Sequence, residues 1–199
     1  MVGIIDYGVG NLFSLRSSFA AIGVEAFVSG DAAELAKADR LILPGVGAFG
    51  DAAEKLRATG LDAFVREQAA AGKPLMGICL GMQLLFERSY EYGEHFGLGL
   101  LKGQVVGMSG RLPEGLKIPH MGWNALKLTK SAKLLEEGSY VYFVHSFYAE
   151  NCEDSLAAVT DYGIPITAAV ERDNIFGCQF HPEKSGNVGL AILKKFCEV

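Results

Sequence analysis

The residue best suited to covalent chemistry is Cys79, which lies between two glycines in the segment Gly77-Ile78-Cys79-Leu80-Gly81. An apolar run ends and a helical pattern begins here, which is the context of a nucleophile elbow, a sharp turn between strand and helix. The glycines permit a tight turn, and the N-terminus of the following helix favours the thiolate. The segment therefore indicates a thiol nucleophile. Taken alone, it also fits a small, buried, unreactive cysteine.

A histidine and a glutamate near the other end of the chain are the candidate partners of this thiol. His181 and Glu183 follow the apolar run 175–179 and are separated by Pro182. Proline cannot continue a helix and biases the preceding residue toward extended backbone, so the two side chains can project to the same side. The other three histidines lack so suitable an acidic neighbour. We therefore predict a triad in which Glu183 orients His181 and His181 serves Cys79.

A glycine-rich loop could stabilise the oxyanion that thioester chemistry creates. This loop, residues 44–50, directly follows the apolar run 40–43. Such an intermediate needs two hydrogen-bond donors. We expect one donor to be the backbone N–H of Leu80, the residue after the nucleophile, and the other to come from Val46 or Gly47.

The same loop raises a competing interpretation, which is dinucleotide binding. Gly45, Gly47 and Gly50 satisfy the pattern Gly-x-Gly-x-x-Gly and stand between a predicted strand and a predicted helix. The next strand, however, ends in Cys79 and not in an acid. The carboxylate expected to bind the ribose about 20 residues further on is therefore absent.

No metal or cofactor is expected. Cys178 and His181 are three residues apart, but a structural zinc site needs four ligands, and no second cysteine or histidine pair has matching spacing. The cysteines are also too few and too irregularly spaced for a disulfide scaffold, so we expect reduced thiols at all four positions: Cys79, Cys152, Cys178 and Cys197.

The elements that must position these residues alternate between strand and helix in the first half of the chain. Apolar runs at 2–7, 24–28, 40–43 and 74–78 predict buried strands, and helical patterns cover 12–22, 51–59 and 61–71. This βαβ rhythm favours a parallel sheet. After residue 100, short alternating runs at 103–108, 124–129, 140–144, 156–160, 166–172 and 175–179 predict antiparallel strands added to that sheet, with a turn at Asp173-Asn174 and a last helix over 188–197. The expected fold class is α/β, a three-layer domain around an open mixed sheet.

Composition argues for one soluble domain over residues 1–199 and against two kinds of partner. The chain is 50% hydrophobic and 21% charged, which suffices for an ordinary core. Its net charge is −5, and no Lys/Arg cluster could neutralise a phosphate backbone. No apolar stretch reaches the roughly 20 residues that span a bilayer, and the N-terminus does not resemble a secretory signal. We expect a cytoplasmic protein that binds neither nucleic acid nor membrane.

Three of these segments, 44–47, 77–83 and 181–183, together resemble the class I, or triad-type, glutamine amidotransferase family. The resemblance implies that family's open, flavodoxin-like α/β sheet. Four segments resemble, more narrowly, the glutaminase subunits of imidazole glycerol phosphate synthases: 6–11, 119–124, 144–147 and 181–185. The triad segments are shared with glutaminases of other pathways, so only the further segments indicate the pathway.

The resemblance implies hydrolysis of glutamine to glutamate and ammonia. Cys79 would attack the side-chain amide, His181 would protonate the departing ammonia, and water would hydrolyse the resulting thioester. Ammonia would pass to a barrel-shaped cyclase subunit, the partner in a heterodimer, which makes imidazole glycerol phosphate and the aminoimidazole carboxamide ribotide in histidine biosynthesis. The substrate-binding residues carried over by position are Gln83, His145, Ser146 and Phe147.

The resemblance also places four residues at the interface with the cyclase, namely Asn11, Trp123, Tyr142 and Lys184. The residues alone leave other roles open. Asn11 could cap the helix that follows it, the two aromatic rings could belong to the core, and Lys184 could be a solvated surface charge.

Two other functions stay open at this stage. The chain could be a glutaminase that serves a different synthase, or a ligand-binding module that keeps the fold without catalysis. The intact set of Cys79, His181 and Glu183 speaks against the second. Residues 87–96 match no motif, and we expect a surface loop there.

Overall fold

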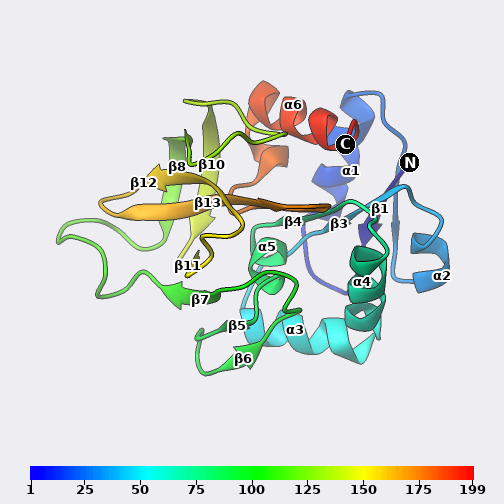
Figure 1. Ribbon diagram of the computed structural model, residues 1–199, viewed down its shortest axis with the longest axis horizontal. Helices are drawn as coiled ribbons and strands as arrows, with labels where there is room; N and C mark the ends of the chain where they lie inside the picture. Colours follow the sequence, from blue (N-terminus) through cyan, green and yellow to red (C-terminus); the bar gives the residue numbers. More distant parts are fainter.

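An eight-stranded mixed sheet lies at the centre of the computed structural model, which describes residues 1–199 (Figure 1). The strand order is β2-β1-β3-β4-β14-β13-β12-β9. The first five strands run parallel, and each later pair is antiparallel. In that order the strands are Ala26–Ser29, Val2–Ile5, Arg40–Leu43, Leu75–Ile78, Ile175–Cys178, Pro165–Arg172, Leu156–Asp161 and Lys127–Leu128.

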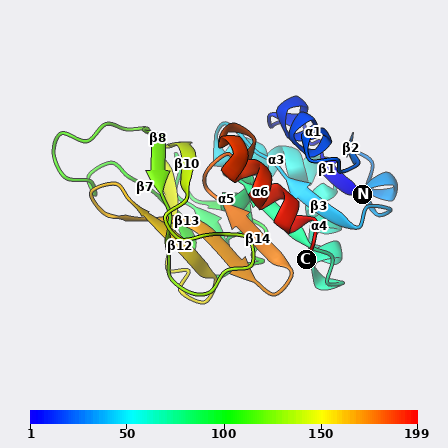
Figure 2. The same cartoon turned by 90° about the horizontal axis from the view of Figure 1, so that it is seen from above.

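Helices cover both faces of this sheet, as the three-layer prediction requires (Figures 1 and 2). One core packs the sheet against α2 (Ala32–Leu35), α3 (Phe49–Ala58), α4 (Leu61–Ala70) and α5 (Leu80–Leu84). The other packs it against α1 (Leu12–Ala21) and α6 (Gly186–Phe196). Both cores consist of buried aliphatic and aromatic side chains, whose removal from water is the main stabilising term. No helix is both long and apolar enough to cross a membrane.

The predicted βα rhythm of the first half is confirmed, with two local differences. Helix α3 begins at Phe49, two residues before the predicted start, because the carboxylate of Glu91 accepts the otherwise unpaired Phe49 N–H at 2.6 Å. Helix α2 was not predicted, and it is a single turn. The Asp31 side chain caps it by accepting hydrogen bonds from the backbone N–H groups of Ala33 and Glu34.

The second half corrects one expectation, because only some of its strands join the central sheet. Strands β8 (His120–Ala125) and β10 (Tyr140–His145) form a separate two-stranded sheet. Strands β11 (Phe147–Glu150), β7 (Gln104–Gly107), β5 (Arg88–Ser89) and β6 (His95–Phe96) form a third sheet. An alternating pattern shows that one face of a strand is buried, but it does not show which sheet the strand joins.

Two further segments differ from expectation. The predicted continuous strand 124–129 is divided between β8 and β9, which belong to different sheets. The predicted loop 87–96 contains the short strands β5 and β6, paired antiparallel, and the Ser89 side chain within it is fully buried. This hairpin packs against α3, so it is part of the fold. The turn predicted at Asp173-Asn174 does connect β13 to β14.

Close backbone packing explains the glycines around the elbow. A Cβ atom at Gly77 would lie 2.6 Å from the Gly81 carbonyl oxygen, and one at Gly45 would lie 2.7 Å from the Gly81 nitrogen. A Cβ at Gly81 would overlap the carbonyl oxygen of Leu43 at the end of β3. The loop after β3 and the elbow after β4 can therefore meet only because these residues lack side chains.

We expect Gly81→Ala to destabilise the protein strongly, because the obstacle is main chain that cannot rotate away. A penalty of about 3 kcal/mol would lower Tm by roughly 6–12 °C in a chain of this size. The matched control is Gly107→Ala, where an added Cβ would meet only the Phe147 ring, at 3.4 Å. Thermal unfolding of both variants measures the difference, and equal Tm values would contradict this account of the packing.

Candidate active site

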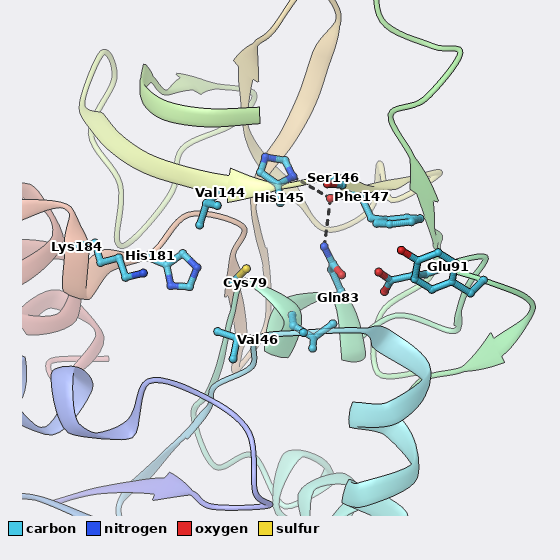
Figure 3. Close-up of a pocket in the computed structure, with 13 residues that line it drawn as sticks. Val46, Cys79, Gln83, Glu91, Val144, His145, Ser146, Phe147, His181 and Lys184 are labelled. Atoms are coloured by element: carbon cyan, nitrogen blue, oxygen red, sulfur yellow. Dashed lines mark hydrogen bonds between the residues drawn. The ribbon is translucent and has the colours of Figure 1, made fainter. Parts of the chain in front are cut away.

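Three loops at the carboxyl ends of parallel strands meet around one cavity of about 360 Å³ (Figure 3). They follow β3, β4 and β14, and this edge of an open α/β sheet is where ligands bind. The cavity is large enough for a small amino acid. Its lining contains Val46, Gly47, Cys79, Leu80, Gln83, Glu91, Tyr92, Val144, His145, Ser146, Phe147, His181 and Lys184.

Cys79 lies in the strained backbone conformation of a nucleophile elbow. Its φ is 54° and its ψ is −112°, at the junction of β4 and α5. A non-glycine residue held there costs on the order of 1–3 kcal/mol. The Cys79 N–H donates to the Cys178 carbonyl at 2.8 Å and holds the turn against β14. The sulfur faces the cavity and His181, as Figure 3 shows.

His181 and Glu183 adopt the geometry that the His-Pro-Glu segment suggested. His181 is extended, with φ −99° and ψ 101°, and its Nδ1 lies 2.8 Å from Glu183 Oε1. The Glu183 side chain is only 1% exposed, so the hydrogen bond is screened from water. The 3₁₀ turn η1 (Pro182–Lys184) and the bond from Ser185 Oγ to the His181 carbonyl fix this segment. The arrangement leaves the other ring nitrogen free to serve Cys79.

Electrostatics favour a charged His181. Burial by itself lowers the pKa of this imidazole, but interactions with Cys79 and Glu183 outweigh it and raise the pKa to about 9. His145 behaves in the opposite way, because burial lowers its pKa to about 3 and keeps it neutral. The two histidines of the cavity are therefore suited to different tasks, one to proton transfer and the other to hydrogen bonding.

The predicted oxyanion donors line the cavity beside the nucleophile. Leu80 is the first residue of α5, so its N–H has no acceptor within the helix. Val46 and Gly47 lie in the loop after β3, where Gly47 has a φ of 96°. The buried Tyr7 hydroxyl donates to the Pro44 carbonyl at 2.7 Å and anchors the start of that loop.

The four predicted substrate-binding residues come together in the lining of the cavity. Gln83 Nε2 donates to the Phe147 carbonyl at 3.2 Å, and His145 Nδ1 donates to the same oxygen at 2.8 Å (Figure 3). Ser146 lies between His145 and Phe147 in the chain and also lines the cavity. These hydrogen bonds hold the end of β10 and the start of β11 against helix α5.

Sequence reasoning missed three lining residues, Glu91, Tyr92 and Val144. Glu91 is the only acidic side chain of the cavity lining, and burial raises its pKa. Tyr92 packs edge-on against the Phe147 ring, with centroids 6.4 Å apart. For Glu91 and Tyr92, the only signal in the sequence was the run of acidic and aromatic residues at 87–96, which matches no motif.

Three of the four predicted interface residues form one cluster at the edge of the cavity. Trp123 is 52% exposed, which excludes a core position, and its ring packs edge-on against Tyr142 with centroids 6.1 Å apart. Lys184 Nζ lies 6.0 Å from the Tyr142 ring centroid and also lines the cavity. Asn11 takes no part in these contacts. It precedes α1 without a side-chain capping bond, so the capping role is not realised.

The structure contains no group of three or more His, Cys, Asp or Glu side chains that could hold a metal ion. The glycine loop after β3 packs against the elbow, where Gly45 lies against the Gly81 backbone.

We expect the His181 imidazole to titrate near pH 9 and its pKa to fall by about one unit or more in Glu183→Gln. Since the folded pKa lies above the ordinary 6.5, the charged ring stabilises the fold fully below pH 6.5, and this contribution is lost as pH rises through 9. NMR titration of the ring nitrogens measures both values. A wild-type value near 6.5 would show that Cys79 and Glu183 do not stabilise the charged ring.

Comparison with known proteins extends over the whole chain. The glutamine amidotransferase class-I profile matches residues 3–199. The imidazole glycerol phosphate synthase subunit HisH of Wolinella succinogenes is 52% identical over 204 residues, covering 100% of both chains. HisH of Bacillus subtilis is 49% identical over 204 residues, covering 100% of this chain and 96% of its own. HisH of Methanothermobacter thermautotrophicus is 50% identical over 201 residues, covering 100% and 98%.

Solved structures of much lower identity share the fold. A crystal structure described as a glutamine amidotransferase has a TM-score of 0.78 at 20% identity and covers 99% of this chain and 97% of that one. PurLQS from Thermotoga maritima has a TM-score of 0.78 at 21% identity with the same coverage. The expected flavodoxin-like α/β fold is thus confirmed. With the profile and the relatives matching over essentially the full length, the chain belongs to the class-I glutamine amidotransferase family and, within it, to the HisH subunits of imidazole glycerol phosphate synthase.

Proposed function

We propose that this chain hydrolyses glutamine at Cys79 and delivers the ammonia to a cyclase subunit, which makes imidazole glycerol phosphate and the aminoimidazole carboxamide ribotide. The observation that carries the proposal is the strained Cys79 beside His181, at a cavity that is also lined by the backbone of Val46, Gly47 and Leu80. This combination provides nucleophile, proton carrier and oxyanion site together.

The reaction follows from this arrangement in two halves. The Cys79 thiolate attacks the amide carbon, and the oxyanion accepts hydrogen bonds from Leu80 and the loop at Val46 and Gly47. The imidazolium of His181 protonates the nitrogen, the C–N bond breaks, and ammonia leaves a thioester. Water then attacks the thioester, His181 takes its proton, and the C–S bond breaks to release glutamate.

The polar lining accounts for recognition of an amino-acid substrate. The Glu91 carboxylate uses one oxygen, Oε2, to accept the Phe49 N–H and makes no protein hydrogen bond with the other. That oxygen can accept from the α-ammonium group of glutamine. Gln83, Ser146 and the backbone around Phe147 supply polar groups for the rest of the substrate. The neutral His145 supports this wall and adds no competing charge.

The partner surface is the cluster of Trp123, Tyr142 and Lys184, with Asn11 beside helix α1 as a further interface residue. Trp and Tyr are enriched in binding hot spots, and here an exposed Trp packs against a Tyr whose ring also lies near the Lys184 ammonium group. The relatives are named as subunits of imidazole glycerol phosphate synthase, which supports a cyclase as the second chain. A cytoplasmic location belongs to this proposal, because all four cysteines are free and the mechanism requires a reduced thiol.

We expect the purified chain to hydrolyse glutamine slowly alone and at least about tenfold faster with the cyclase subunit and its nucleotide substrate, because partner contacts at the cavity edge complete the oxyanion geometry. Glutamate release measures both rates. Rapid hydrolysis by the isolated chain would contradict the coupling. Hydrolysis that the cyclase does not stimulate would indicate a different synthase.

We expect Cys79→Ala to abolish glutamine-dependent product formation by the complex and to leave ammonium-dependent formation within about twofold of wild type. The nucleophile serves only the first half-reaction, so supplied ammonium bypasses it. The cyclase product is measured with each nitrogen source. Equal loss with both sources would show that Cys79 also supports the partner, and the proposed division of labour would be wrong.

A further inference from the structure

Gln179 is a fully buried polar residue beside the nucleophile that the mechanism above does not use. It follows strand β14, and its side chain is 0% exposed. Its Nε2 lies 3.7 Å from Cys79 Sγ, a hydrogen-bond distance for a sulfur acceptor, and its Oε1 accepts from Gln83 Nε2 at 3.0 Å. A buried amide with both ends paired is held rigidly, because each lost hydrogen bond would leave a desolvated polar group.

The surrounding hydrogen bonds determine which end of this amide faces the sulfur. The Phe147 carbonyl can only accept, so the Gln83 group that meets it must be the NH₂. The same NH₂ faces Gln179, so the Gln179 atom that meets it must be the carbonyl oxygen. The Gln179 NH₂ is therefore directed at Cys79. Its orientation is set by Gln83, 96 positions away in the chain, and Gln83 is oriented in turn by the Phe147 carbonyl, 64 positions from Gln83.

Local backbone geometry brings Gln179 and His181 to the same atom. Both side chains reach the Cys79 sulfur, while Phe180 between them is buried in the core. The Gln179 N–H donates to the Ala168 carbonyl at 2.9 Å, and the His181 N–H donates to the Tyr142 carbonyl at 3.0 Å. Cys79 thus receives an amide donor and an imidazole from one short segment.

We propose that Gln179 is a catalytic residue that donates an N–H hydrogen bond to the Cys79 thiolate. The bond stabilises the charged sulfur before it attacks and again when the thioester breaks. Nucleophilicity falls only in part as a thiolate is stabilised, with a Brønsted coefficient of about 0.4–0.5, so a larger thiolate fraction at neutral pH increases the net rate. This role rests on the proposed thioester mechanism.

Two substitutions separate the donor role from a purely structural one. Gln179→Met keeps the length of the side chain and removes the N–H. Gln179→Glu keeps an acceptor for Gln83 and places a carboxylate against the sulfur. If Gln179 served only to hold Gln83, Cys79 would keep its reactivity in the Glu variant and lose it in the Met variant. If its N–H serves Cys79, the sulfur should lose reactivity in both variants. The loss should be larger in the Glu variant at pH 8, since the carboxylate and the thiolate repel each other.

The readout is the pH dependence of Cys79 alkylation by iodoacetamide, followed on the Cys79 peptide by mass spectrometry. In Gln179→Met we expect the midpoint to move up by about one unit and the rate at pH 7 to fall about tenfold, with the alkaline plateau retained. The other titratable groups beside Cys79, which are Tyr7, Cys178 and His181, stay in every variant. In the complex with the cyclase, kcat for glutamine should fall about tenfold and KM should change less than about twofold.

The matched control is Thr167→Val. Thr167 is also buried, and its hydroxyl also lies 3.7 Å from a cysteine sulfur, that of Cys152, and neither residue lines the cavity. This variant should leave the Cys79 alkylation profile unchanged.

An unchanged midpoint in Gln179→Met, or a wild-type rate in Gln179→Glu, would overturn the donor role. Because alkylation needs no glutamine, it tests Gln179 even if the proposed glutaminase activity fails. A shifted midpoint without glutamine turnover by the wild-type complex would therefore support the hydrogen bond and refute the proposed function.

Discussion

The contact between the Gly81 backbone and the Leu43 carbonyl is the constraint on which the rest of the site depends. It brings the loop after β3 against the elbow after β4, so that the oxyanion donors and the nucleophile share one edge of the sheet. It also resists relaxation of the strained backbone at Cys79. Two hydrophobic cores pack against opposite faces of the sheet that carries this contact. Because such cores are close-packed, they keep the contact in place.

Two kinds of polar group line different parts of the cavity. A charged imidazole lies beside Cys79, and neutral hydrogen-bonding groups surround the Phe147 carbonyl. The positive charge beside Cys79 belongs to His181, where interactions with Cys79 and Glu183 outweigh the effect of burial on the pKa. On the opposite wall, His145 and Gln83 meet at one carbonyl oxygen, that of Phe147, and remain neutral. Each buried polar group there has a partner, so the wall keeps its shape without additional charges. A site of this kind can hold a reactive ion pair beside a rigid substrate pocket.

The small sheet of β8 and β10 connects the proposed partner surface to the reacting groups. The Tyr142 backbone accepts a hydrogen bond from His181 N–H and donates one to Ser185 Oγ, so strand β10 is attached to the segment that carries the imidazole. The side chain of the same Tyr142 contacts Trp123 and Lys184. A displacement of this strand by a bound partner would therefore reach His181 through one residue. Packed elements with two discrete arrangements transmit such changes better than flexible loops.

The sequence by itself determined what depends on neighbouring residues. The βα rhythm, the elbow at Cys79 and the extended His181-Pro182-Glu183 segment could all be predicted, because each results from backbone preferences and periodicity within a few positions. Only the tertiary structure decided which of the later strands share a sheet and which distant polar groups meet. Glu91 pairs with a backbone N–H 42 residues away, and Gln179 contacts a sulfur 100 residues away. Local pattern contains no information on such pairs, because they are selected by the packing of the whole chain around its cores.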